Sequence, residues 1–167
     1  MHKSYLAISC VFFVVLLSGC GTLHKAEHEQ IVTVSKPIKS VPITVSYQGG
    51  VFYRVQVNNT LPTAITLAWD ESVYVTTAGE SVRILHLRNK YNLPERAPAQ
   101  QASSPIAPNS QFQADFIGDD WLDCARRSCT PQPKDGFKNA RIYLAFNIKG
   151  KRVTWQGEVA FVPPKQP

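Results

Sequence analysis

Apolar and polar residues alternate with a period of two through most of the chain after residue 42. This alternation is typical of β-strands that bury one face, because successive side chains point to opposite sides of a strand. No stretch keeps the period of 3.6 that an amphipathic helix requires. The pattern predicts strands over residues 43–48, 51–57, 65–69, 73–75, 81–87, 112–117, 140–148 and 153–161.

Turn residues separate these segments at short intervals. Gly49-Gly50 and Lys149-Gly150-Lys151 suit hairpins, and a bulge is expected near Asp70. About seven or eight strands with such frequent turns predict an all-β antiparallel sandwich or barrel. We expect a β-sandwich of immunoglobulin-like character. Cys124 and Cys129 lie too close in sequence to form the disulfide that joins the sheets of true immunoglobulin domains.

A separate apolar run covers residues 6–17, and Lys3 precedes it. The run is shorter than the roughly 20 residues that cross a bilayer, and it is typical of a secretory signal peptide. The tetrapeptide Leu17-Ser18-Gly19-Cys20 at its end resembles the lipobox of bacterial lipoproteins. This resemblance implies cleavage before Cys20 and lipid on that cysteine. In that class an aspartate after the cysteine favours the inner membrane, so Gly21 implies the outer membrane, with the domain facing the periplasm.

The chain is therefore expected to divide into four parts. These are a signal peptide at 1–19, a lipidated N-terminus and tether at 20–42, one β-sandwich domain at 43–163 and a tail at 164–167. Residues 30–35 also alternate, so a first strand inside the tether is the alternative. The formal net charge of +6 is spread along the chain and does not indicate a nucleic-acid-binding protein.

Two long segments, 88–104 and 118–136, lack a strand pattern. Long loops in compact domains are frequently functional, although a plain linker is the alternative for the first of them. We take these loops as the candidate contact surface, because tryptophan and arginine contribute strongly to interfaces. For Trp121 the alternative is an apolar plug at the end of the sandwich. The candidate contact residues are Tyr91, Trp121, Arg126 and Arg127.

Cys124 and Cys129 are the two cysteines that follow Cys20 in the chain. Because an exported protein meets an oxidising compartment, they are expected to form a short disulfide. A redox or metal pair is the alternative. The C-x4-C spacing differs from the C-x-x-C of thioredoxin-like sites, and no histidine lies nearby in sequence.

Few residues indicate catalysis. Ser72, His86 and Asp70 supply the residue types of a Ser-His-Asp site, but the chain has no G-x-S-x-G elbow. A small hydrolase using Ser72 and His86 is the enzymatic alternative to a non-enzymatic protein. The simpler interpretation places His86 in a hydrogen bond at the sheet margin and Asp70 in a turn.

A cluster of carboxylates in and just before the second long loop offers oxygen ligands for Ca²⁺. Its order does not match an EF-hand loop, so ion pairs with Arg126 and Arg127 are the favoured interpretation. The cluster consists of Asp115, Asp119, Asp120 and Asp123. We expect no metal site and no cofactor.

The segment ITLAWDESVYVTTAGESVRILH at residues 65–86, followed by SPIAPNSQF, resembles a pattern in small uncharacterised outer-membrane lipoproteins. The matching positions within 58–110 are Asn58, Trp69, Asp70, Ser72, Arg83, His86 and Pro108. The resemblance implies an exported accessory domain and supplies no activity.

We therefore expect a non-enzymatic outer-membrane lipoprotein that binds protein or envelope partners. An accessory subunit of a secretion, conjugation or pilus assembly is one form of this hypothesis. A phage- or plasmid-encoded surface- or superinfection-exclusion lipoprotein is the alternative. A third hypothesis, a carrier with lipid in its interior, requires an interior that side chains do not fill.

Overall fold

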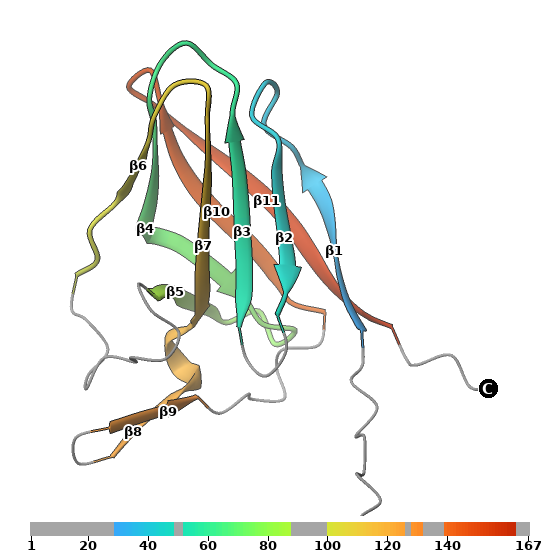
Figure 1. Cartoon of the computed structure of the whole chain (residues 1–167). Coiled ribbons are helices and arrows are strands. Elements are labelled where there is room, and N and C mark those ends of the chain that lie inside the picture. The colour runs from blue at the N-terminus through green and yellow to red at the C-terminus, as the bar shows by residue number, and fades with distance from the viewer. Residues whose placement is uncertain (1–28, 49–51, 88–99, 126–127, 132–138, 163–167) are drawn as a thin grey trace, which may run out of the picture.

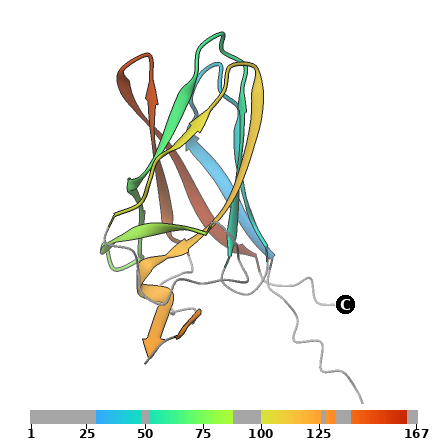
Figure 2. The same ribbon diagram turned by 60° about the vertical axis from the view of Figure 1, so that its left-hand side comes forward.

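A computed structural model describes residues 29–48, 52–87, 100–125, 128–131 and 139–162. Figures 1 and 2 show antiparallel strands arranged in two facing layers. The helical element within the described ranges is a single 3₁₀ turn, η1 (Asp119–Trp121). The strands are β1 (Glu29–Lys36), β2 (Ile43–Tyr47), β3 (Tyr53–Asn59), β4 (Ile65–Val75), β5 (Ser81–Leu87), β6 (Ser104–Ile106), β7 (Ser110–Gly118), β8 (Leu122–Ala125), β9 (Ser128–Pro131), β10 (Arg141–Ile148) and β11 (Lys151–Val162).

The main sheet has the strand order β1-β11-β10-β4-β5-β7-β3-β2, with β6 paired to β4. β5 joins the two layers, because its first residues pair with the end of β4 and residues 84–87 pair with β7. β1 and β2 stand at the two ends of this order and lie close to each other, so the sheet is nearly closed (Figure 1). The prediction of an antiparallel all-β sandwich is confirmed.

Three features differ from or sharpen the predicted elements. β1 pairs with β11, so the sheet begins at Glu29, ahead of the expected domain boundary at residue 43. The second long loop contains a hairpin, β8–β9, where no strand was expected. The expected bulge near Asp70 is present within β4, where the register with β10 shifts.

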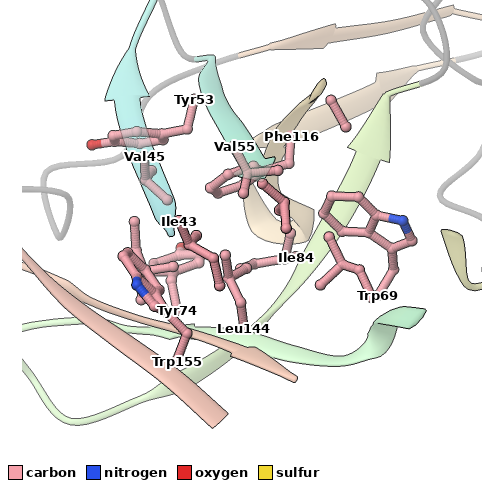
Figure 3. Packing of buried hydrophobic residues seen from close by; sticks show 14 of the residues in the cluster. Ile43, Val45, Tyr53, Val55, Trp69, Tyr74, Ile84, Phe116, Leu144 and Trp155 are labelled. Carbon is pink, nitrogen blue, oxygen red and sulfur yellow. The ribbon is translucent and has the colours of Figure 1, made fainter. Parts of the chain in front are cut away.

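The core lies between the two layers and is filled by large side chains (Figure 3). Trp69, Trp121 and Trp155 are each at most 1% exposed. The space between Tyr53, Tyr74 and the residues around them amounts to only about 10 Å³. Side chains fill the described interior, which argues against an internal lipid carrier.

Candidate functional site

The two ends of the sandwich are unlike. One end, called here the turn end, has the short connections 37–42, 60–64, 107–109 and 149–150. The opposite end carries η1 and the β8–β9 hairpin, and segment 100–103 leads from it into β6 (Figure 1). We call this the loop-bearing end. The described parts of both predicted contact loops lie at or beside it.

An arginine between two aspartates links three elements at the loop-bearing end. The guanidinium of Arg83 on β5 donates to Asp119 Oδ2 of η1 from Nη2 at 2.8 Å and from Nε at 3.1 Å. Its Nη1 lies 3.9 Å from Asp70 Oδ1 in the bulge of β4. The three side chains are about 30% exposed, at 27%, 28% and 32%. Ion pairs this exposed contribute little individually, and their main effect is to fix the relative positions of these elements.

Gln101 ties segment 100–103 to the same network. Its Nε2 donates to the carbonyl of Ile84 at 2.7 Å, and its Oε1 accepts the backbone N–H of His86 at 2.7 Å. The backbone N–H of Gln101 donates to the carboxylate of Asp70 at 2.9 Å. The side-chain amide of Gln101 thereby forms the hydrogen bonds that a neighbouring strand would form with this part of β5. These bonds satisfy backbone groups at the point where β5 leaves β4.

His86 stacks on Trp69, with the ring centroids 4.5 Å apart and the planes 5° from parallel. Trp69 Nε1 donates to Ser104 Oγ at 2.8 Å, so the indole is fixed at both its face and its edge. A hydrogen bond was the prediction for His86 at the sheet margin; its backbone N–H donates to Gln101 Oε1, and its ring stacks on Trp69. Its ring packs on an indole, and the hydrogen bonds of Ser72 Oγ join backbone groups of Ala68 and Ala145.

Ser72 completes the bulge of β4. Ala68 pairs with Ala145 and Val73 pairs with Tyr143, so residues 69–72 of β4 lie opposite a single residue of β10. Ser72 Oγ donates to the carbonyl of Ala68 at 2.8 Å and accepts the N–H of Ala145 at 3.0 Å. The side chain is 0% exposed. The hydrolase alternative therefore has no accessible nucleophile at Ser72.

Replacing Ser72 by alanine is expected to lower the free energy of unfolding by about 1–3 kcal/mol. The variant leaves the buried N–H of Ala145 without its hydrogen-bond acceptor. Chemical denaturation of the variant and the parent measures this difference. Ser46→Ala, at an exposed position of β2, is the matched control and should change stability by less than about 0.5 kcal/mol. Equal effects of the two substitutions would contradict the role of Ser72 in the bulge.

Trp121 is buried in the core, at 1% exposure. Its Nε1 donates to the hydroxyl of Tyr74 at 2.8 Å, and that hydroxyl donates in turn to Asp120 Oδ1. The ring centroid of Trp121 lies 5.4 Å from that of Tyr74 and 6.4 Å from that of Tyr53. Trp121 therefore closes the loop-bearing end as a plug. Its assignment as an exposed contact residue is corrected, because an apolar ring with a satisfied N–H is more stable inside.

The two tyrosines beside Trp121 should make stability depend on alkaline pH. Burial raises the pKa of Tyr53, and burial together with the hydrogen bond to Asp120 raises the pKa of Tyr74. A raised folded-state pKa favours the neutral phenol, so this stabilisation is complete below the ordinary tyrosine pKa near 10 and is lost above it. We expect the free energy of unfolding to fall by roughly 1.4 kcal/mol per pH unit for each tyrosine above about pH 10.

Denaturation curves between neutral pH and the alkaline range test this dependence. Tyr53→Phe and Tyr74→Phe should each remove about one tyrosine's share of the slope. Unchanged slopes in both variants would show that other groups cause the alkaline loss of stability.

The aspartates predicted as a cluster have separate partners. Asp115 Oδ1 accepts from Arg54 Nε at 2.7 Å and Asp115 Oδ2 from Arg54 Nη2 at 3.0 Å, and this bidentate bond raises the pKa of Arg54. Asp119 binds Arg83, and Asp120 binds Tyr74. The ion pairs thus involve arginines of β3 and β5. In the described ranges, no three His, Cys, Asp or Glu side chains are grouped as metal ligands would be.

The remaining predicted site residues fall on parts of the chain that are described incompletely or not at all. Cys124 and Cys129 are direct backbone partners in the β8–β9 pairing. The expected positions Cys20, Tyr91, Arg126 and Arg127 lie outside the described residues, so their roles stay predictions.

Comparisons with known proteins add no assignment. No protein-family model matches the chain, and no curated protein and no solved structure matches it either. Within the described ranges, no helix combines the length and the apolar character that spanning a membrane requires.

Proposed function

We propose that this protein is a non-enzymatic outer-membrane lipoprotein whose β domain binds a protein or envelope partner in the periplasm. The observation that carries the proposal is the sequence Leu17-Ser18-Gly19-Cys20 at the end of a short apolar run. Acyl chains on Cys20 would each contribute about 0.8 kcal/mol per buried CH₂, so anchoring by several chains is effectively permanent.

The position of β1 supports a specific orientation on the membrane. β1 begins at Glu29, so only residues 21–28 separate Cys20 from the sheet. Eight residues span at most about 28 Å even when fully extended. Figure 1 shows β1 starting at the loop-bearing end. An anchor at Cys20 is therefore expected to hold this end toward the membrane surface and the turn end away from it.

The loop-bearing end is the proposed contact surface. Arg83, Asp70, Asp119 and Gln101 fix the bulge of β4, β5, η1 and segment 100–103 relative to one another. A surface held in one arrangement loses less conformational entropy on binding than a flexible one. Anchoring adds to this advantage, because confinement to the membrane raises the effective concentration for partners located there.

Site-specific photo-crosslinking in cells tests the proposed surface. A photoreactive residue replaces either Ala102, which is exposed beside Gln101, or Lys151, which is exposed at the turn end. We expect a discrete adduct from position 102 and none from position 151. Adducts from position 151 alone, or none from either position, would contradict the assignment of the contact surface.

We further propose a disulfide between Cys124 and Cys129. Directly opposite residues of antiparallel strands have Cα atoms about 4.5–5.5 Å apart, which lies within the range that a disulfide spans. Its expected effect is to hold the β8–β9 hairpin closed. Mass spectrometry of the unreduced chain should show the loss of two hydrogens and no alkylation at either cysteine. Alkylation of both cysteines without reductant would exclude the bond.

A further inference from the structure

A hollow lies on the outer face of β2, β3 and β7, toward the turn end. Its volume is about 260 Å³. This is just below the range of pockets that enclose whole drug-sized ligands, so it fits a short segment of a longer molecule. Pro42, which is exposed, contributes apolar surface to it, whereas Val57 and Phe112 alternate with the outward residues and pack toward the core. The polar side chains of the lining are Thr44, Gln56, Asn58, Gln111 and Gln113.

The strand register places these polar side chains in two rows. Thr44, Gln56 and Gln113 are cross-strand partners in one row, and Asn58 and Gln111 are partners in the next. Thr44 Oγ1 donates to Gln56 Oε1 at 3.4 Å, and Gln56 Nε2 donates to Gln113 Oε1 at 3.1 Å. These bonds orient the amides of the first row and leave each of them further hydrogen-bonding capacity.

The side chains of the second row have more remaining hydrogen-bonding capacity than those of the first. In the described part of the chain, the side-chain amides of Asn58 and Gln111 make no hydrogen bond, and both residues are exposed. Each amide offers a carbonyl acceptor and an NH₂ donor. The hollow therefore presents several donors and acceptors to a ligand without requiring the loss of an existing contact.

The lack of charge in the lining indicates a neutral ligand. None of the described residues that line the hollow is charged. The adjacent row of the same face holds Arg54 and Asp115, which neutralise each other at 2.7 Å. An anion or a cation would lose hydration here without gaining a counter-charge, and an apolar ligand would desolvate the amides without satisfying them.

We propose that this hollow, the amide hollow, binds a neutral saccharide segment. Sugar hydroxyls donate and accept hydrogen bonds as amides do, and the apolar C–H face of a pyranose ring suits the exposed ring of Pro42. The inference goes beyond the proposed function and does not depend on the lipid anchor. If the anchor is present, the hollow lies nearer the end that points away from the membrane.

Titration followed by NMR tests the inference on the full chain, in a detergent that has no sugar headgroup. Cellotetraose and tetra-N-acetylchitotetraose are the neutral probes, and tetragalacturonate is the anionic control of similar size. We expect at least one neutral probe to shift the side-chain amide resonances of Asn58, Gln111 and Gln113, with a dissociation constant of roughly millimolar order. The anionic probe should shift them less.

Substitutions then locate the contact. Asn58→Ala and Gln113→Ala should each weaken binding roughly threefold to tenfold, the effect of one lost hydrogen bond. Asn147→Ala, an exposed amide on β10 in the other layer, is the matched control and should leave binding unchanged. The inference is overturned if neither neutral probe shifts these resonances up to about 10 mM. It is also overturned if the anionic probe binds more tightly, or if Asn147→Ala has the same effect as the other two variants.

Discussion

Substituting Trp121 by alanine is expected to lower the free energy of unfolding by about 3–5 kcal/mol. The substitution empties the end of the core, where the indole is 1% exposed and packs against Tyr74 and Tyr53. It also removes the N–H that donates to the Tyr74 hydroxyl. A domain of this size has a total stability of roughly 5–15 kcal/mol, so this is a large fraction of it. Chemical denaturation monitored by circular dichroism measures the change.

Two further variants test whether the loss of stability comes from the packing of the indole in the core and not simply from removing an apolar side chain. Trp121→Phe keeps most of the ring volume and should cost clearly less than alanine. Val34→Ala, at a position that is 40% exposed on β1, should change stability by less than about 0.5 kcal/mol. A Trp121→Ala variant as stable as Val34→Ala would mean that Trp121 is not part of the core.

The Cys20→Ser variant is expected to leave the membrane fraction almost completely. Serine offers no thiol for lipid attachment, and the mature domain would then lack its anchor. Cell fractionation with immunodetection measures the distribution. Gly21→Asp is the informative companion, because the resemblance to lipoproteins implies that it moves the protein to the inner membrane while leaving it lipidated. A Cys20→Ser protein that stays membrane-bound in equal amount would contradict the lipid anchor.

The strands could be predicted wherever one face is buried along their whole length. On β10, the inward residues Ile142, Leu144 and Phe146 are all at most 2% exposed, and the alternation is clear in the sequence. β1 is ambiguous because it lies at the end of the sheet order and its side chains from Thr33 to Lys36 are exposed, with Val34 at 40%. β8 and β9 are four residues each and carry no apolar alternation, so the local sequence does not indicate that the two segments pair.

The contacts of the loop-bearing end could not be predicted for a different reason. Arg83 and Asp119 are 36 positions apart, and Gln101 reaches the backbone of His86 over 15 positions. Such contacts depend on which strands are neighbours in the sheet, and the hydrophobic periodicity of the sequence does not contain that information. Asp115 and Asp119 are predicted to form ion pairs, and the partners that the structure describes for them, Arg54 and Arg83, come from other strands.

The most direct test of the lipid anchor, on which the proposed function rests, is the intact mass and N-terminal sequence of the chain extracted from membranes. We expect a chain that begins at Cys20 and carries a diacylglyceryl group on sulfur and an acyl group on its amino nitrogen. A chain that begins at any other residue, or one that begins at Cys20 without added lipid, would contradict it.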